Sequence, residues 1–363
     1  MLRIAIVGCG KIADAHASAI AMIPDAALIG ACDSEEMMAK QLSERFRIQR
    51  YFSDLNAMLE SVRPDVVHIT TPPQTHFELG KACLNANCHI YMEKPFAING
   101  REAEQLIQLA VQKNLKVTVG TDEQFSHVAV EMRKLVQEGY LGGPPVHMEA
   151  YYCYDLGDER YACAFLANKA HWVRSLPGQI MQNVISHGIA RIAEYLAGDR
   201  VQVIASGFTS PFLRKMGESE LVDELRAIII DERQTTAYFT FSTQMRPLLR
   251  EFRVYGPKNG LILDQDHHAL IRVPGKAYPS YADKFIPLRH YARQYRKAMT
   301  ANARLFLKRD FHMKSGLKRL VELFYRSVEE NTSVPIPYRE ILLTATIMDS
   351  LFDQIGPSRR GSN

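Results

Sequence analysis

Short apolar runs alternate with helical stretches over the first 120 residues. Five runs have the length and β-branched content of strands: 3–8, 27–32, 65–70, 89–92 and 116–120. Helical patterns separate them at 11–22, 34–45, 76–86 and 100–113. Strands that alternate with helices of about ten or more residues form βαβ units with right-handed crossovers, so this order predicts a doubly wound parallel sheet.

The pattern changes after residue 122. A helix is predicted over 125–139, and strand-like runs with short connections follow at 146–154, 201–206, 225–231, 235–242, 250–255 and 261–264. Helical patterns return at 289–308, 315–330 and 337–354. Successive strands joined by tight turns indicate an antiparallel or mixed sheet. We therefore expect an α/β protein with a doubly wound domain over 1–122 and an α+β domain over 123–363.

Composition excludes several classes of protein. Of the 363 residues, 47% are apolar and 23% are charged, which is typical of a globular chain and not of a disordered one. A net charge of +4 does not favour nucleic acid, and no nucleic-acid recognition motif occurs. The longest run without Asp, Glu, Lys or Arg, residues 175–190, is short and partly polar. No stable membrane insertion is expected.

The N-terminus and the cysteines favour a cytoplasmic protein. The opening MLRIAIVGCG superficially resembles a signal sequence, but Lys11 and Asp14 interrupt it, and a buried first strand is the better interpretation. No cysteine pair has C-x-x-C or zinc-ligand spacing. The six cysteines are Cys9, Cys32, Cys83, Cys88, Cys153 and Cys163. We expect buried thiols in a reducing compartment and no metal site.

A glycine-rich turn joins the first strand to the first helix. Gly8, Gly10 and Ala13 form the pattern G-x-G-x-x-A. The first glycine permits a tight turn, the second lets the backbone approach a pyrophosphate, and the alanine allows close packing of helix and strand. Backbone amides at the helix start, at Lys11 and Ile12, favour phosphate oxygens. The turn predicts a dinucleotide site.

Asp33 ends the second strand-like run, 23 positions after Gly10. An acidic residue at about this spacing binds the adenosine ribose hydroxyls in dinucleotide-binding folds. Its charge also repels a 2′-phosphate, and Ser34 follows it where an arginine would accommodate that phosphate. NAD is therefore the expected cofactor, although an arginine from elsewhere in the fold leaves NADP open.

Glu93-Lys94-Pro95 follows the strand-like run 89–92. Parallel sheets bind ligands beyond the carboxyl ends of their strands, which places Lys94 near the cofactor. A lysine there can hydrogen-bond a substrate hydroxyl and move its proton when partial burial lowers its pKa. A structural ion pair between Lys94 and Glu93 is an equally good interpretation of the spacing alone.

These features together resemble the Gfo/Idh/MocA family of oxidoreductases, named for glucose-fructose oxidoreductase, inositol dehydrogenase and rhizopine catabolism. The resemblance rests on several segments: 8–13, Thr71-Pro72-Pro73, His76, Glu93-Lys94-Pro95, 178–187 and Val254-Tyr255-Gly256. It spans nearly the whole chain. It implies a Rossmann domain followed by a domain with an open, mainly antiparallel sheet.

The resemblance also implies roles for particular residues. Lys94 matches the family's catalytic lysine, and further cofactor contacts are implied for Thr71, Pro72, His76 and Glu93. The family carries D-x-x-x-H at the start of a helix in the second domain. Here the matching positions are Asn183 and His187, so a catalytic histidine is retained while the aspartate is replaced. An asparagine can orient an imidazole but cannot raise its basicity by charge.

The sequence alone does not decide the roles of His187 and Asn183. His187 could be a core histidine on the apolar helix 184–196, and Asn183 could be a helix cap. Three further residues between 151 and 174 are candidate substrate contacts: Tyr154, Trp172 and Arg174. Trp172 could stack on a sugar or simply pack in the core, and Arg174 could hold a carboxylate or phosphate.

Positive charge is concentrated in residues 284–319. This segment contains eleven Lys or Arg and one acidic residue, Asp310, and it also carries Tyr and Phe side chains. A basic amphipathic helix can be a solvated or oligomer-facing surface, can neighbour an anionic substrate, or can lie on an anionic membrane. The sequence leaves these three interpretations open.

The resemblance favours an NAD(P)-dependent oxidoreductase that moves a hydride between nicotinamide and a sugar, polyol or sugar-derivative hydroxyl or ketone. Two alternatives remain: a redox-neutral NAD-dependent glycosidase or lyase, and a non-catalytic dinucleotide-binding regulator. The expected partner is a sugar-like small molecule. An open sheet face usually needs covering, which favours a homodimer or homotetramer.

Overall fold

A computed structural model describes residues 1–156, 168–310 and 315–355. The chain forms two compact units. The first is Met1–Asp122 together with Gly316–Asp349, and the second is Glu123–Ser315 together with the chain from Ser350 onward. The segment 316–349, assigned from the sequence to the second domain, thus packs with the N-terminal unit. Cys163 lies outside the described residues.

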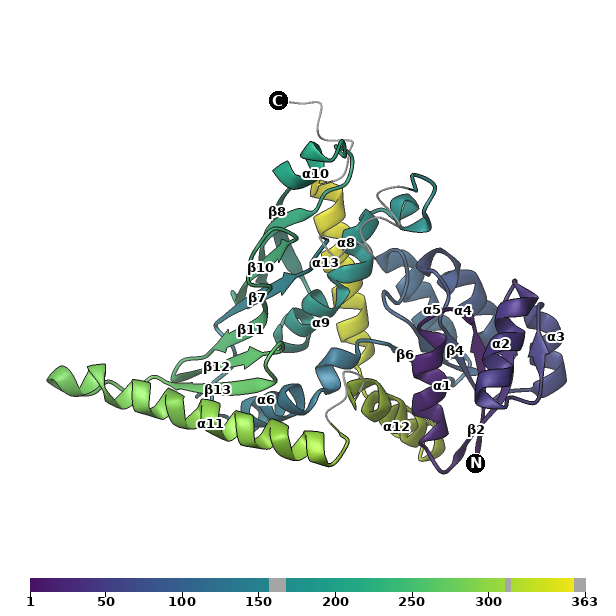
Figure 1. Ribbon diagram of the computed structural model, residues 1–363, viewed down its shortest axis with the longest axis horizontal. Coiled ribbons are helices and arrows are strands. Elements are labelled where there is room, and N and C mark those ends of the chain that lie inside the picture. The colour runs from purple at the N-terminus through teal and green to yellow at the C-terminus, as the bar shows by residue number, and fades with distance from the viewer. Residues whose placement is uncertain (157–167, 311–314, 356–363) are drawn as a thin grey trace. The chain divides into compact units, whose positions relative to one another are not determined.

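The first unit contains a six-stranded sheet in the order β3-β2-β1-β4-β5-β6, with every pair parallel. Its strands are β1 Leu2–Val7, β2 Ala26–Cys32, β3 Tyr51–Phe52, β4 Val66–Ile69, β5 His89–Met92 and β6 Val117–Val119. This is the strand order of the dinucleotide-binding fold. The predicted doubly wound parallel sheet is confirmed (Figure 1).

Helices follow the strands of this sheet. They are α1 Ala13–Ala21, α2 Glu36–Phe46, α3 Leu55–Val62, α4 His76–Asn85 and α5 Gly100–Gln112, with a short 3-10 helix at Pro73–Thr75. Asp54 and Asn99 cap α3 and α5 by accepting hydrogen bonds from backbone amides. The pair β3 and α3 was not predicted, because two strand residues leave no measurable alternation.

Two C-terminal helices follow, α12 Ser315–Glu329 and α13 Tyr338–Ile355; α12 from Gly316 and α13 up to Asp349 belong to the first unit. Phe324 and Tyr325 of α12 are buried against the sheet, where their rings contact Tyr91 and His68. Lys116, just before β6, donates to the backbone carbonyls of Ser327 and Thr332. These contacts explain why 316–349 joins the N-terminal unit.

The second unit is built on a seven-stranded sheet in the order β13-β12-β11-β7-β10-β9-β8. Its strands are β7 His147–Cys153, β8 Val201–Phe208, β9 Glu224–Asp231, β10 Thr236–Ser242, β11 Arg250–Tyr255, β12 Asn259–Asp264 and β13 Ala269–Pro274. Only the β7–β10 pair is parallel. The implied mainly antiparallel sheet is thus confirmed.

The described helices of the second unit are α6 His127–Gln137, α8 Gln179–Val184, α9 Ser186–Tyr195, α10 Pro211–Lys215 and α11 Ile286–Leu307, with 3-10 turns at Asp122–Phe125, Trp172–Ser175 and Ser280–Lys284. Helix α9 lies on one face of the sheet (Figure 1). Gly188 allows this contact, since a Cβ there would lie 2.7 Å from the Phe239 ring. No helix in the described part of the chain is long and apolar enough to cross a membrane.

Candidate active site

The two glycines of the glycine-rich turn have different surroundings: Gly8 is tightly packed, and Gly10 is not. Gly8 has φ +91°, and a Cβ on it would lie 2.6 Å from Thr71 Cγ2 and 2.8 Å from the Thr71 amide nitrogen. A Cβ on Gly10 would have no heavy atom within 4 Å. Gly8 is therefore held against the loop after β4, while the backbone at Gly10 borders open space. This arrangement fits the approach of a pyrophosphate.

The N-terminus of α1 fits the same group. Ile12, at the N-cap position, has no side chain that can accept a hydrogen bond from the first turn. Lys11 and Ile12 are both exposed. Helix N-termini that lack a side-chain cap leave amides for an external acceptor, and the helix dipole favours an anion there.

Asp33 is hydrogen-bonded to the glycine-rich turn. Its Oδ2 accepts a hydrogen bond from the Cys9 amide at 2.6 Å, and its Oδ1 accepts one from the Glu35 amide at 2.9 Å. Each carboxylate oxygen keeps a further lone pair for a ribose hydroxyl. Burial, with Asp33 nearby, raises the pKa of Cys9 to about 12, so this thiol stays protonated and unreactive.

His76 ties together two loops of the first unit. Its Nδ1 lies 2.9 Å from the Pro95 carbonyl, and its Nε2 lies 2.9 Å from the Thr71 carbonyl. The ring is fully buried, and burial lowers its pKa although the carbonyls oppose this. Thr71 also accepts a hydrogen bond from Thr75 at 2.7 Å. His76 thus braces the loops after β4 and β5, a supporting role for the predicted cofactor site.

Lys94 follows β5 at the carboxyl edge of the parallel sheet. Its backbone amide donates to Glu93 Oε2 at 3.1 Å, and its side chain is partly buried. The other carboxylate oxygen, Glu93 Oε1, lies 2.9 Å from His16 Nε2. Gly120 leaves room for this carboxylate, since a Cβ there would lie 2.8 Å from Glu93 Oε1. Glu93 therefore positions the backbone of Lys94.

A buried chain of hydrogen bonds runs back from Glu93. His16 Nδ1 lies 2.8 Å from His68 Nδ1, and His68 Nε2 lies 2.8 Å from the Tyr325 hydroxyl. One set of tautomers satisfies every contact: Tyr325 donates to His68, His68 to His16, and His16 to the Glu93 carboxylate. The Tyr91 ring stacks on His68 at 4.6 Å. No sequence pattern predicts this chain, because its members come from α1, β4, the end of β5 and α12.

His187 belongs to a separate cluster in the second unit. Its ring stacks on Tyr152 at 6.2 Å, and the Tyr152 hydroxyl donates to Glu123 Oε1 at 2.9 Å. Burial alone would raise the pKa of Glu123, but His187, Arg191 and two side-chain hydrogen bonds lower it below its usual range. Arg191 is buried and donates to the Glu123 carbonyl at 3.0 Å and to Gln265 at 3.2 Å. Glu123 is thus an ionised carboxylate beside His187.

A family model described as "Oxidoreductase family, NAD-binding Rossmann fold" (GFO_IDH_MocA) matches residues 2–121. These are the residues of the parallel sheet and the glycine-rich turn. The N-terminal domain thus matches the Gfo/Idh/MocA oxidoreductase family. That domain is an NAD-binding Rossmann domain.

Curated relatives match over a similar length. The D-glucoside 3-dehydrogenase of Escherichia coli K12 is 33% identical over 142 residues, which are 39% of this chain and 40% of that protein. The UDP-N-acetylglucosamine 3-dehydrogenase of Acidithiobacillus ferrooxidans is 32% identical over 149 residues, or 41% and 44% of the two chains. The chain therefore spans less than half the length of the curated relatives that it matches.

Solved structures are similar over the whole chain. The same Acidithiobacillus enzyme superimposes with a TM-score of 0.72 at 20% identity, covering 97% of this chain and 98% of that one. The WlbA dehydrogenase from Bordetella pertussis, solved with NADH and UDP-GlcNAcA, has a TM-score of 0.76 at 16% identity and covers 97% and 95%. At these identities the likeness shows the two-unit fold alone.

The position of Asn183, where the resemblance implies an aspartate, lies on α8. Asn183 is half-buried, and the predicted helix over 184–196 is confirmed as α9, which begins at Ser186; α8 before it was not predicted. Glu123, the first residue of the second unit, places a carboxylate beside His187, where the motif at 183–187 has none. Nothing in the residues 183–187 could have signalled it, because Glu123 is distant in sequence.

The predicted substrate contacts have different surroundings. Arg174 donates to Glu218 at 2.7 Å, and both side chains are largely buried, so the charge of Arg174 is balanced within the second unit. The ring of Trp172 lies 5.5 Å from that of His171. The Tyr154 amide donates to the Ser242 carbonyl at 3.1 Å, which extends the β7–β10 pairing by one residue. No described contact brings these three side chains together.

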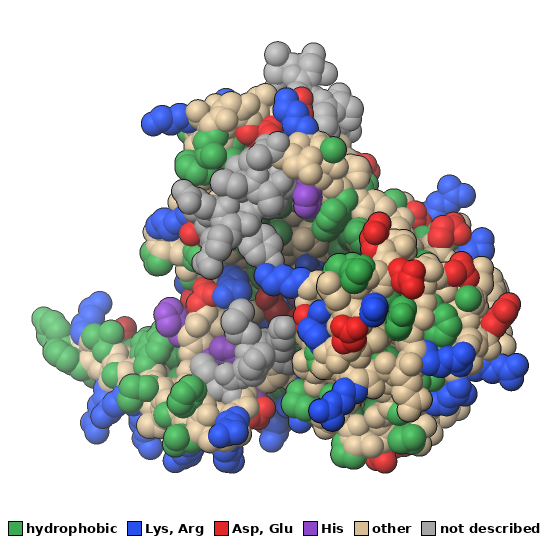
Figure 2. Space-filling view, turned by 45° about the vertical axis from the view of Figure 1, so that its right-hand side comes forward, with side chains coloured by type: hydrophobic (Ala, Val, Ile, Leu, Met, Phe, Trp, Pro, Cys, Tyr) green, Lys and Arg blue, Asp and Glu red, His purple; other side chains and the backbone are tan. Residues whose placement is uncertain are grey.

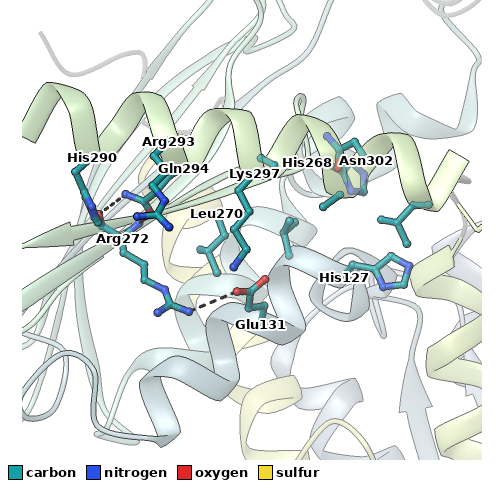
Figure 3. A pocket seen from close by; sticks show the side chains of 14 residues that line it. His127, Glu131, His268, Leu270, Arg272, His290, Arg293, Gln294, Lys297 and Asn302 are labelled. Atoms are coloured by element: carbon teal, nitrogen blue, oxygen red, sulfur yellow. Dashed lines mark hydrogen bonds and ion pairs between the residues drawn. The ribbon is translucent and has the colours of Figure 1, made fainter.

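A separate cavity of about 530 Å³ lies under helix α11 (Figure 3). Arg272 points toward Glu131 at 3.6 Å, and its backbone exchanges two hydrogen bonds with the Gln294 side chain. Arg293, Lys297 and His290 also line it. None of the predicted cofactor, catalytic or substrate residues does.

Proposed function

We propose that the protein is an NAD(P)-dependent dehydrogenase or reductase that acts on a secondary hydroxyl or ketone of a sugar, polyol or sugar derivative. The observation that carries the proposal is Lys94 at the carboxyl edge of an NAD-binding Rossmann sheet, with its backbone held by Glu93. The names of the relatives support the substrate class, since they include a D-glucoside 3-dehydrogenase and a UDP-N-acetylglucosamine 3-dehydrogenase.

The cofactor would be held by the turn at Gly8 and Gly10, by the start of α1 and by Asp33. When bound, NAD supplies a nicotinamide that accepts or returns a hydride. Residues of the chain itself would transfer the proton. The Lys94 side chain hydrogen-bonds the substrate oxygen, and its neutral amine takes the hydroxyl proton as the carbonyl forms and so becomes an ammonium. In the reverse direction it returns that proton.

His187 would be a substrate-binding and catalytic residue of the second unit. Glu123 would take the part that a neighbouring aspartate has in the family motif. Its carboxylate favours the protonated imidazole electrostatically, and Tyr152 links the two groups. Asn183 would orient the imidazole or a substrate hydroxyl without contributing charge.

The expected assembly is a homodimer or homotetramer in the cytoplasm. One face of the second sheet carries α9, and apolar side chains are exposed on strands of the same sheet: Ile204, Phe208, Ile228 and Tyr238. A second copy of the chain would cover them.

The decisive experiment measures reduced nicotinamide by absorbance. Purified protein is incubated with NAD or NADP and a panel of polyols, free sugars and nucleotide sugars, beside the variants Lys94→Ala and Lys40→Ala. Lys40 is an exposed lysine of α2 and serves as the matched control. Turnover should vanish in Lys94→Ala, persist in Lys40→Ala, and leave NAD affinity unchanged in both.

Two other outcomes would replace the proposal. Product formation without net NADH would indicate a redox-neutral glycosidase or lyase that uses NAD transiently. Binding of NAD and of a sugar, measured by calorimetry, with no turnover of either would indicate a dinucleotide-binding regulator. Undiminished turnover in Lys94→Ala would remove the proton-transfer role from this lysine.

A further inference from the structure

Helix α11 is long but buries none of its residues. It covers 22 residues, Ile286–Leu307, and runs beside the edge strand β13 (Figure 1). Gln294 attaches it to that strand: its side chain accepts from the Arg272 amide at 2.8 Å and donates to the Arg272 carbonyl at 3.0 Å. The helix therefore covers the strand edge with one face and leaves the rest of its surface in solvent.

An apolar stripe runs along the solvent side of α11. Its members are Leu288, Tyr295, Met299 and Phe306, each between 54 and 71% exposed. The spacings of seven, four and seven residues place all four within a narrow arc at 100° per residue. Phe285 and Leu307 add exposed apolar side chains at the two ends. Four large apolar groups on one line are not the scattered exposure of an ordinary surface.

A basic face adjoins this stripe. Residues 284–309 contain eight Lys or Arg and no Asp or Glu. Arg293 and Lys297 line the cavity beside Arg272 and Glu131 (Figure 3), whereas Arg289, Arg296 and Arg304 do not line it and are exposed. At the lower left of Figure 2, basic and apolar side chains lie next to each other where α11 projects.

The distribution of charge selects among the possible occupants of this face. The segment 284–319 carries a formal charge of +10, which leaves −6 for the rest of the chain. Two copies that met through α11 would bring like charges together, which opposes self-association. Nucleic acid would match the arginines but would leave the apolar stripe in water. An anionic lipid surface can bind the arginines and bury the apolar stripe at the same time.

We propose that α11 is a membrane-docking helix that lies in the plane of an anionic bilayer surface. The stripe Leu288, Tyr295, Met299 and Phe306 would enter the boundary between headgroups and acyl chains, and Arg289 and Arg296, which flank it, would contact anionic headgroups. The helix lies on the surface and does not span it. The docking goes beyond the proposed dehydrogenase activity and does not depend on it.

Co-sedimentation of the full-length protein with vesicles tests the proposal without cofactor or substrate. Vesicles of phosphatidylcholine alone are compared with vesicles that also contain phosphatidylglycerol. The wild type should bind only the anionic vesicles, and added salt should weaken the binding. The variant Arg289→Gln/Arg296→Gln should bind ~25-fold more weakly, since each basic residue near such a surface contributes about fivefold.

The apolar variant Leu288→Gln/Met299→Gln/Phe306→Gln should also lose at least ~10-fold in binding, because three buried apolar groups are lost. Matched controls place the same changes on exposed sites of the first unit: Met22→Gln/Met37→Gln/Val111→Gln for the apolar set and Lys40→Gln/Arg101→Gln for the basic set. Both controls should bind as the wild type does. All the substituted side chains are exposed, and circular dichroism verifies that each variant is folded.

Three results would overturn the proposal. Absence of wild-type binding to anionic vesicles, with a lower oligomeric state in the apolar variant by analytical ultracentrifugation, would make α11 an interface between copies. Binding to a DNA duplex but not to vesicles would make it a nucleic-acid surface. Vesicle binding that survives the apolar substitutions would show electrostatic attachment without insertion of the stripe.

Discussion

His16 Nε2 lies 2.9 Å from Glu93 Oε1, and both side chains are buried in the N-terminal unit. This contact joins the helix that begins at the dinucleotide turn to the residue that holds the backbone of Lys94. It is also the last link of the chain from Tyr325 through His68.

Removal of the imidazole should destabilise the N-terminal unit. In His16→Ala the Glu93 carboxylate loses a buried partner, and the expected cost is about 3 kcal/mol in the free energy of unfolding. Tyr325→Phe removes only the far hydroxyl and should cost about 1 kcal/mol. Urea unfolding followed by circular dichroism measures both. Equal costs would mean that Glu93 does not depend on His16.

Stability should fall in mild acid because of His68. Burial, reinforced by His16, lowers its pKa well below 6.5 in the folded protein. The unfolded imidazole still takes up a proton below pH ~6.5, so the unfolded state gains stability there by about 1.4 kcal/mol per pH unit. The stability that depends on neutral His68 is fully present above pH ~6.5 and is lost as the pH falls below it. His68→Asn should remove this part of the slope between pH 6.5 and 5 in urea titrations, and an unchanged slope would show that His68 is not its source.

Substitution of the two glycines of the turn should have different effects, on stability at Gly8 and on NAD affinity at Gly10. Gly8→Ala forces a Cβ into Thr71 at a positive φ, which should cost about 2 kcal/mol or more in stability. Gly10→Ala has open space, so the fold should keep its stability while NAD affinity drops ~10-fold or more. Thermal unfolding and calorimetric NAD titration separate the effects. Full NAD affinity in Gly10→Ala would place the pyrophosphate elsewhere.

Asp33 should set the choice between NAD and NADP. Asp33→Ser combined with Ser34→Arg removes the charge that repels a 2′-phosphate and adds one that attracts it. The NADP-to-NAD affinity ratio should rise ~10-fold or more. Ser34→Arg alone, which keeps the carboxylate, is the control and should shift the ratio less. A ratio that stays constant in the double variant would mean that other residues read this end of the cofactor.

Glu123 should be a positioning residue for His187. Glu123→Gln keeps the shape but removes the charge, and kcat should fall ~10- to 100-fold with NAD affinity unchanged. Glu123→Asp should recover part of the loss, which a merely structural role would not require. Tyr152→Phe removes only the 2.9 Å hydrogen bond and should have the smaller effect. Normal kcat in Glu123→Gln would leave His187 without a carboxylate partner.

Periodicity predicted most of the long elements. The strand Arg250–Tyr255 has the predicted bounds, and α12 and α13 begin and end within one residue of the prediction. The omissions are short or lie at an edge: β3, α3, α8, α10 and β13. A strand of two residues has no alternation, and an edge strand such as β13 takes half of its environment from a helix that comes later in the chain.

Local sequence patterns were enough to predict the Rossmann domain, the turn at Gly8 and Gly10, Asp33 and the place of Lys94 after a strand. Each depends on residues close together in the chain, where local steric and hydrogen-bonding rules operate. The packed structure was needed to show that Glu123 lies beside His187, that Arg174 is paired with Glu218, and that His16, His68 and Tyr325 form one buried chain with Glu93. Those contacts join elements that are distant in sequence, and packing alone brings them together.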